Sequence, residues 1–166
     1  MMGGAITGES REGKGSTFSF TAVFEKQTGD IHDRNVPLTD LKGVKILAVD
    51  DHGTNRLLVS KLLTTWGCRH AEACDGAGAI SALRQAVLEG DPFQAALIDM
   101  QMPGMDGYEV CRRLKAEGRT AAVPVIFVTG AADEGDRARA GSLGAADFLV
   151  KPLDPAAVLA SVAAHA

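Results

Sequence analysis

Acidic side chains follow two apolar stretches of the chain, in a pattern that could hold a cation or take part in phosphoryl transfer. Asp50 and Asp51 come directly after the apolar run 44–49, and Asp99 comes directly after the run 95–98. Taken alone, the pair Asp50-Asp51 is better explained as a helix N-cap with a solvated neighbour, and Asp99 is explained equally well as an acid that caps a turn. Together they would repel one another unless a cation joined them. The neighbouring sequence has no His or Cys spacing typical of a softer metal, so the oxygen ligands favour Mg²⁺.

A hydroxyl group and an ammonium group end two further apolar stretches. Thr129 follows the run 124–128, and Lys151 follows the run 148–150 and precedes Pro152. Ligands of open parallel sheets bind outside the carboxyl ends of the strands. If all four stretches are parallel strands, their polar end residues meet at one edge of the sheet. The set then predicts a metal-assisted site that accepts a phosphoryl group.

From residue 41 onward, short apolar runs alternate with stretches that have apolar residues at helical spacing. Strands are predicted at 44–49, 69–73, 95–98, 124–128 and 148–150, and helices at 54–66, 76–88, 107–117, 133–143 and 155–164. Asp154 is the predicted N-cap of the last helix, with Pro155 at its first position. The nearly continuous apolar strands predict a parallel sheet covered by helices on both faces.

The N-terminal segment differs in pattern from the rest of the chain. Stretches 5–10 and 16–24 flank a polar turn that contains glycine, and phenylalanines alternate with polar residues in the second stretch. This period of two predicts a β-hairpin. The residues that follow are polar and aperiodic, as in a linker. The predicted organisation is a hairpin segment at 1–26, a linker at 27–42 and a domain at 43–166.

The composition is that of an ordinary folded domain. Of the 166 residues, 46% are hydrophobic, which suffices for a core and argues against a disordered chain. The net charge of −4 gives no reason to expect binding to nucleic acid. No stretch approaches the roughly 20 apolar residues that span a bilayer, and the N-terminus lacks the layout of a secretion signal. The three cysteines fit no metal spacing and are expected to be reduced thiols in a cytoplasmic protein.

Four motifs, in their order along the chain, resemble the signature of response-regulator receiver domains of two-component systems. They are Asp50-Asp51, the stretch 97–107 (LIDMQMPGMDG), Val128-Thr129-Gly130 and the stretch 148–152 (FLVKP). The resemblance covers about residues 43–166. It implies a flavodoxin-like, doubly wound α/β fold of five strand–helix units, with a parallel sheet in the order 2-1-3-4-5.

The resemblance implies that Asp99 is the phosphoacceptor and that a Mg²⁺ site, which Asp99 shares, lies beside it. By position, Asp51 resembles the direct Mg²⁺ ligand, Asp50 a ligand through water, and the backbone carbonyl of Gln101 a further contact. A carboxylate can attack phosphorus to form an acyl phosphate, and positioning and cation charge supply most of the catalysis. His52 stands where receivers of hybrid kinases often carry Asn, which is a mild departure beside the acid pair.

The resemblance also implies roles for three residues around the phosphoacceptor. Lys151 would pair with the phosphoryl oxygens, Thr129 would hydrogen-bond one of them, and Phe148 occupies the position of the switch aromatic. The peptide bond between Lys151 and Pro152 is often cis in such domains, which would direct the ammonium group into the site. Gly130 stands where many members have Ala, and access for a phosphoryl group is expected to survive this change.

The N-terminal segment resembles the last glycine box and closing hairpin of a histidine-kinase ATP-binding domain. The residues concerned are 2–6 (MGGAI) and 10–20 (SREGKGSTFSF). The order of kinase end, linker and receiver is that of a hybrid sensor histidine kinase, so the chain resembles the C-terminal part of one. Its own chemistry would then be limited to gain and loss of phosphate at Asp99. The parent protein would be a protein histidine kinase, either cytoplasmic or anchored in a membrane.

The expected partners are a histidine kinase domain that donates the phosphoryl group and a histidine phosphotransfer protein or domain that receives it. No helix-turn-helix follows the fifth unit, so a transcription factor is not expected, and neither is contact with a membrane. An isolated hairpin is marginally stable and has unpaired edges, so this one could also join two copies in a homodimer.

Two other functions are compatible with parts of the pattern. A phosphatase of the haloacid dehalogenase type shares the Asp nucleophile, Mg²⁺, Thr and Lys. It requires a second Asp two residues after the nucleophile, where this chain has Gln101. An interaction module that resembles a receiver but is no longer phosphorylated would not need all five polar residues. The receiver interpretation is therefore favoured.

Overall fold

The structure is a computed structural model that describes residues 4–11, 15–21, 41–130 and 134–166. The chain divides into two units, Met1–Asn35 and Val36–Ala166. Most of the predicted linker at 27–42 lies outside the described residues, as does the end of the second predicted hairpin strand.

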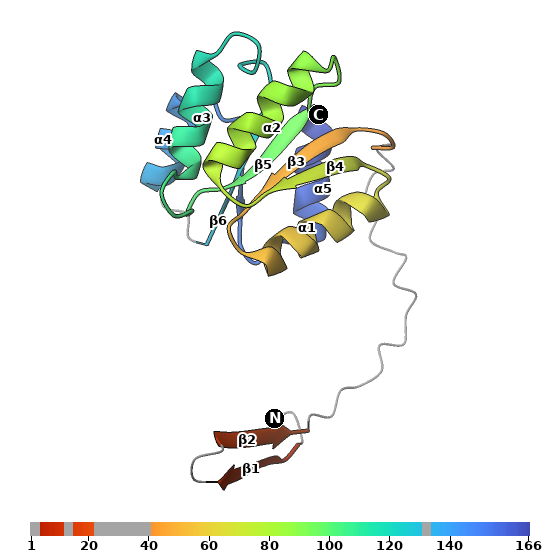
Figure 1. Ribbon diagram of the computed structural model, residues 1–166, viewed down its shortest axis with the longest axis vertical. Coiled ribbons are helices and arrows are strands. Elements are labelled where there is room, and N and C mark those ends of the chain that lie inside the picture. The colour runs from red at the N-terminus through yellow and green to blue at the C-terminus, as the bar shows by residue number, and fades with distance from the viewer. Residues whose placement is uncertain (1–3, 12–14, 22–40, 131–133) are drawn as a thin grey trace. The chain divides into compact units, whose positions relative to one another are not determined.

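The larger unit contains a five-stranded parallel sheet (Figure 1). Its strands are β3 (Lys45–Val49), β4 (Arg69–Ala73), β5 (Ala95–Asp99), β6 (Val125–Thr129) and β7 (Asp147–Val150). They lie in the order β4-β3-β5-β6-β7, with every neighbouring pair parallel. This confirms the predicted order 2-1-3-4-5. The crossovers place the ends of β3, β5 and β6 next to one another, at the edge where the polar residues were expected.

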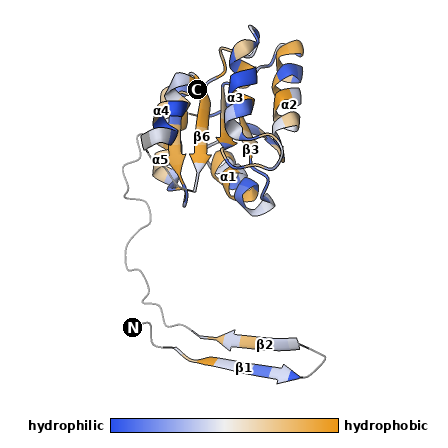
Figure 2. Ribbon diagram, turned by 90° about the vertical axis from the view of Figure 1, so that its left-hand side faces the viewer, coloured by the Kyte–Doolittle hydropathy of each residue, from blue (hydrophilic) through white to orange (hydrophobic). Residues whose placement is uncertain are grey.

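Four helices connect the strands, and a fifth follows the last strand; together they cover both faces of the sheet. They are α1 (Gly53–Thr65), α2 (Gly76–Leu88), α3 (Gly107–Ala116), α4 (Glu134–Ser142) and α5 (Pro155–His165). On one face the core includes residues of α2, α3 and α4, and on the other it includes residues of α1 and α5. The strands are accordingly coloured as hydrophobic where the helices cover them (Figure 2). The predicted helices are confirmed, with ends that differ by no more than two residues.

The core follows directly from alternation along the strands. Leu47 and Val49 of β3 belong to one core cluster, whereas Ile46 and Ala48 belong to the other. All five residues of β5 are buried, which places that strand at the centre of the sheet. A strand covered on both faces has no side that tolerates polar residues, so polar groups appear only where it ends. Asp99 is the last residue of β5.

Side-chain caps define the start of three helices. Asp75, Asp106 and Asp154 each accept a hydrogen bond from the backbone amide three residues later. The predicted cap at Asp154, with Pro155 in the first turn, is confirmed. The N-cap of α1 is His52, and it makes no capping hydrogen bond. Neither Asp50 nor Asp51 therefore serves as a helix cap, and both are left for another role.

The smaller unit contains an antiparallel hairpin of β1 (Ile6–Arg11) and β2 (Gly15–Phe20). Its first strand begins one residue later than predicted. Ile6 pairs with Phe20 and Gly8 with Phe18, so the apolar side chains share one face. Phe18 and Phe20 are about three-quarters exposed, at 73% and 78%. The apolar face of the hairpin is therefore uncovered among the described residues.

Among the described residues, no helix is both long and apolar enough to cross a membrane. The three cysteines are free thiols, as expected, with Cys68 and Cys111 buried and Cys74 exposed.

Gly107 begins α3 directly against the end of β5, and we predict that it tolerates no side chain. A Cβ atom there would lie 2.6 Å from the carbonyl oxygen of Asp99 and 2.9 Å from the Cα of Met100. Backbone atoms cannot rotate away, so Gly107→Ala should lower the free energy of unfolding by about 1–3 kcal/mol or more. Urea unfolding measures this. Gly118→Ala is the control, because nothing lies within 4 Å of its added methyl group. Equal stability of the two variants would contradict the prediction.

Candidate functional site

One ammonium group joins two buried carboxylates at the carboxyl edge of the sheet. The Lys151 Nζ donates to Asp99 Oδ2 at 2.8 Å and to Asp50 Oδ2 at 2.9 Å. Asp50 and Asp99 are only 6% and 4% exposed, whereas the Lys151 side chain is partly accessible. The peptide bond between Lys151 and Pro152 is cis, as expected. The structure therefore brings together three of the residues that the sequence indicated, from the ends of three different strands.

Asp50 is held by a full set of donors. Besides Lys151, the backbone amide of His52 donates to its Oδ1 at 2.8 Å, and the Asn55 side-chain amide lies 3.0–3.1 Å from both oxygens. Burial alone would raise the pKa of Asp50, but the hydrogen bonds from Lys151, His52 and Asn55 outweigh it. The pKa of Asp50 therefore lies below its ordinary value, and this acid is ionised at neutral pH.

Asp99 has fewer donors and a less favourable electrostatic environment. Its partners are Lys151 and the backbone amide of Gln101, which donates to Oδ1 at 3.2 Å. Burial raises the pKa of Asp99 above its ordinary value, and the negative charge of Asp50 adds to this effect. Burial lowers the pKa of Lys151, but its hydrogen bonds to Asp99 and Asp50 outweigh this and raise it, so the ammonium stays charged. A basic, buried carboxylate beside a fixed ammonium suits a nucleophile in phosphoryl transfer.

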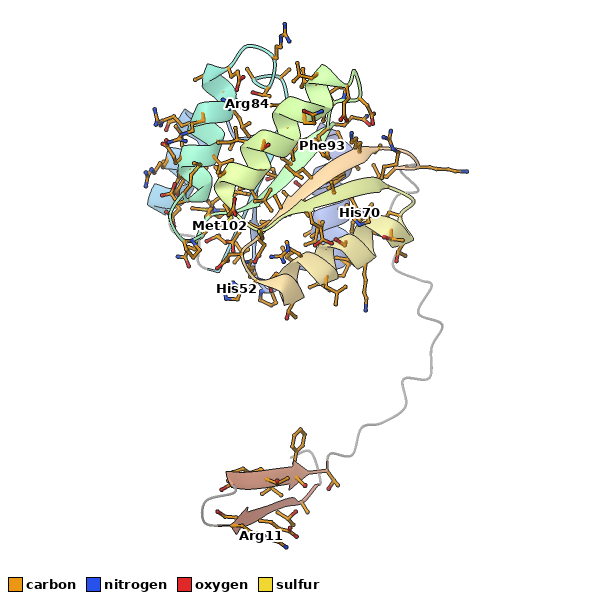
Figure 3. All side chains as sticks on the ribbon, in the orientation of Figure 1. Arg11, His52, His70, Arg84, Phe93 and Met102 are labelled. Atoms are coloured by element: carbon orange, nitrogen blue, oxygen red, sulfur yellow. The ribbon has the colours of Figure 1, made fainter. Side chains whose placement is uncertain are left out.

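Asp51 lies at the more exposed side of the cluster, next to His52. The His52 Nδ1 is 2.9 Å from Asp51 Oδ1 and 3.9 Å from Asp50 Oδ1. Each of these three residues offers one ligand atom, and the three atoms lie within 4.8 Å of one another. Among the described residues, this is the group of His, Cys, Asp and Glu that could hold a metal ion. Figure 3 shows His52 at the start of α1.

Thr129 and Phe148 lie near the cluster on the next two strands. Thr129 is buried at the end of β6, one residue beyond the partner of Asp99 in the strand register. Its carbonyl accepts a hydrogen bond from the backbone amide of Lys151 at 2.6 Å. Phe148 of β7 is half-buried against the core, with the Arg137 guanidinium 5.4 Å from its ring centroid. Phe148 therefore contacts α4, and Thr129 lies on the neighbouring strand.

Several residues around the site were not singled out by the sequence. Asn55 and Arg56 both contact Asp50, the latter by donating to its carbonyl oxygen at 2.7 Å. A signal for them existed, since polar residues in the first turn of a helix that follows an acid pair can reach back to it. No such local signal existed for Tyr108, whose hydroxyl donates to Asp136 of α4 at 2.8 Å.

Comparison with known families assigns the domain. Residues 46–163, which contain every residue of the cluster, match the response regulator receiver domain. The chain belongs to this family. Two solved structures illustrate the fold of this receiver. Chemotaxis protein CheY4 of Vibrio cholerae is 27% identical with a TM-score of 0.69, over 75% of this chain and 99% of that chain. The receiver domain of sensor histidine kinase PA1611 from Pseudomonas aeruginosa PAO1 is 28% identical with a TM-score of 0.66, over 74% of this chain and 97% of that chain.

Curated relatives include a response regulator and a sensor protein. Response regulator PleD of Caulobacter vibrioides is 38% identical over 118 residues, which are 71% of this chain and 25% of PleD. Sensor protein EvgS of Escherichia coli K12 is 32% identical over 155 residues, which are 92% of this chain and 12% of EvgS. The chain thus spans a quarter or less of these two relatives. The haloacid dehalogenase alternative matches neither the family nor these relatives.

The opposite pKa shifts of the two buried acids predict stability effects of opposite sign. In EDTA at neutral pH, Asp99→Asn should stabilise the receiver and Asp50→Asn should destabilise it. A raised pKa means that the fold prefers the protonated acid, so Asp99 loses its favourable contribution as the pH rises through its raised pKa. A lowered pKa means that Asp50 contributes when ionised, above its ordinary value of 3.8.

Urea unfolding at several pH values measures both effects. The gain in the free energy of unfolding from Asp99→Asn should shrink as the pH falls from the raised pKa toward 3.8, because Asp99 of the natural receiver then becomes protonated. The disadvantage of Asp50→Asn should shrink only below 3.8, as the pH falls through the lowered pKa. If both substitutions change the free energy of unfolding in the same direction at neutral pH, this electrostatic description of the cluster is wrong.

Proposed function

We propose that this receiver accepts a phosphoryl group on Asp99 from a phosphohistidine. The observation that supports this most directly is the pairing of a buried, basic Asp99 carboxylate with the Lys151 ammonium at 2.8 Å, beside the ionised Asp50. Asp99 ends the central strand of the sheet, at the edge where ligands of such folds bind.

In the proposed reaction, an oxygen of Asp99 attacks the phosphorus atom of the phosphohistidine. A bond between this oxygen and phosphorus forms, the bond between phosphorus and the donor imidazole nitrogen breaks, and the electron pair leaves with the imidazole. Lys151 then pairs with the phosphoryl oxygens instead of the free carboxylate, since it already lies within hydrogen-bond distance of Asp99. The Thr129 hydroxyl donates a hydrogen bond to one of the same oxygens. These contacts stabilise negative charge where it develops.

The acidic cluster fits a Mg²⁺ ion by its donor set. Asp50 and Asp51 offer carboxylate oxygens at a position that is open to solvent on the Asp51 side. We propose that Asp51 binds the ion directly, Asp50 through water, and Asp99 and the Gln101 carbonyl as further ligands. The bound ion supplies positive charge that neutralises the phosphoryl oxygens during transfer. The PA1611 receiver is described with a magnesium ion coordinated in its active site cleft, which supports this proposal.

We further propose that the receiver acts in a phosphorelay within or beside a hybrid histidine kinase. A histidine kinase domain would donate the phosphoryl group, and a histidine phosphotransfer protein or domain would receive it from Asp99. Support comes from two relatives, the hybrid signal transduction histidine kinase L of Dictyostelium discoideum and sensor protein EvgS. A receiver that has lost phosphorylation is disfavoured because Asp50, Asp99 and Lys151 keep their mutual contacts.

The hairpin β1–β2 is proposed to close a histidine-kinase ATP-binding domain, with the segment 1–26, the linker 27–42 and the receiver 43–166 in that order. An alignment with EvgS over 92% of the chain must extend well before residue 46, where the receiver match begins, which supports this order. The uncovered face of Phe18 and Phe20 would then pack against the remainder of that domain. Pairing of two hairpins in a homodimer is the alternative use of the same face.

Phosphorylation at Asp99 is tested by intact-mass analysis after incubation with acetyl phosphate. The receiver should gain the mass of one phosphate when Mg²⁺ is present, and Asp99→Asn should gain none. Asp51→Ala should weaken Mg²⁺ binding by at least about tenfold, because even partners of metal ligands typically contribute that much. Asp91→Asn is a matched control, since Asp91 pairs with Lys45 at the start of β3 rather than with the cluster. A mass gain that persists in Asp99→Asn would refute the assignment.

Phosphorylation is further expected to shift the position of α4 through Thr129 and Phe148. If Thr129 moves toward the phosphoryl oxygens, it leaves space that the half-buried Phe148 ring can enter, which removes the ring from Arg137. Beryllofluoride with Mg²⁺ should therefore change NMR amide shifts over residues 134–164. Phe148→Ala should reduce these changes, while shifts at the binding site itself remain. Unchanged shifts over this region in the natural receiver would argue against the coupling.

A further inference from the structure

His52 introduces a nitrogen atom into an otherwise oxygen-lined cation site. Its Nδ1 lies 2.9 Å from Asp51 Oδ1 and 3.9 Å from Asp50 Oδ1, on the side of the cluster away from Lys151. The two carboxylates are the proposed ligands of Mg²⁺. The imidazole nitrogen therefore lies close enough to them to act as a further ligand. The sequence alone indicated only a mild departure at this position.

Two of the three atoms, His52 Nδ1 and Asp51 Oδ1, have the spacing of neighbouring ligands in a coordination sphere. Two ligands at right angles, each about 2.1 Å from a metal, lie about 3 Å apart. The distance between His52 Nδ1 and Asp51 Oδ1 matches this value, and all three ligand atoms lie within 4.8 Å of one another. A single divalent ion can therefore contact the imidazole and Asp51 after small side-chain rotations, with Asp50 near enough to bind through water.

The surroundings of His52 allow such rotations. Its side chain is 72% exposed, and its ring contacts the Asp50 and Asp51 carboxylates. Its backbone is fixed by its place at the start of α1 and by the hydrogen bond from its amide to Asp50. The Cα is thus held beside the acid pair, while the ring remains free to turn from Asp51 toward a bound ion.

Nitrogen and oxygen donors select different cations. Mg²⁺ prefers oxygen ligands and gains little from an imidazole, whereas Co²⁺, Ni²⁺, Cu²⁺ and Zn²⁺ bind imidazole strongly. We propose that His52 is a ligand of the cation site and shifts its preference from Mg²⁺ toward divalent transition metals such as Co²⁺ and Ni²⁺. This inference rests on the proposed cation site at Asp50 and Asp51. It specifies which metal ions this site prefers, which membership of the family alone does not.

Calorimetric titration of the natural chain with Ni²⁺ and with Mg²⁺, at about pH 8 where free imidazole is neutral, tests the inference. His52→Asn should weaken Ni²⁺ binding by at least about tenfold and change Mg²⁺ binding by less than about threefold. Asn is chosen because its amide can still donate a hydrogen bond to Asp51, so positioning of that carboxylate is retained. His70→Asn is the matched control, because His70 is an exposed histidine on β4, apart from His52 (Figure 3).

Electron paramagnetic resonance of bound Cu²⁺ gives a second readout that does not depend on affinity. The natural chain and His70→Asn should show nitrogen coupling at this site, and His52→Asn should lose it. Equal losses of Ni²⁺ and Mg²⁺ affinity in His52→Asn would overturn the inference, since His52 would then only orient Asp51. Unchanged Ni²⁺ affinity and unchanged nitrogen coupling in His52→Asn would overturn it as well.

The same titrations distinguish failure of the His52 inference from failure of the proposed cation site. If Mg²⁺ binds the natural chain and Asp51→Ala removes that binding, the cation site stands whatever His52 does. If Mg²⁺ does not bind, or binds equally in Asp51→Ala, the proposed cation site itself is wrong and the inference falls with it.

Discussion

The structure of the site depends on one shared ion pair, in which the Lys151 ammonium lies between two carboxylates that are almost fully buried. Two negative charges in such a place are unfavourable unless a positive charge joins them. Lys151 supplies that charge from β7, while Asp50 follows β3 and Asp99 ends β5. The same ion pair therefore joins the ends of three strands and includes Asp99, the residue that is proposed to react.

The two acids are chemically identical but have different environments, and their roles follow from this difference. Asp50 receives donors from Lys151, His52 and Asn55, which favour its ionised form. Among the described residues, the donors to Asp99 are Lys151 and one backbone amide, and the nearby charge of Asp50 also raises its pKa, so its carboxylate is the more basic. The more basic carboxylate is also the one at the end of the central strand. In the proposed function, these local donors suit Asp50 to bind a cation and leave Asp99 as the nucleophile.

Polar and aromatic contacts join α4 to α3. On the side of α3, the Tyr108 hydroxyl donates to Asp136, and Arg139 lies 4.0 Å over the Tyr108 ring. Tyr108 also packs edge-on against Phe127, with ring centroids 5.4 Å apart. These polar and aromatic contacts hold α4 in place without making it a fully apolar part of the core. A helix held in this way can move without exposing a large apolar surface.

The sequence by itself determined the element order, the parallel sheet and the polar residues at its edge. Apolar runs such as 95–98 have no polar face, so their burial on both sides and their polar ends are local properties of the chain. Asn55 and His52 lie within five residues of Asp50, so their contacts with it are local to the start of α1. Lys151 is 101 residues from Asp50 and 52 from Asp99 along the chain, and only the tertiary structure decided that it joins the two acids. These contacts depend on side-chain directions and distances across the sheet edge, and spacing along the chain does not encode them.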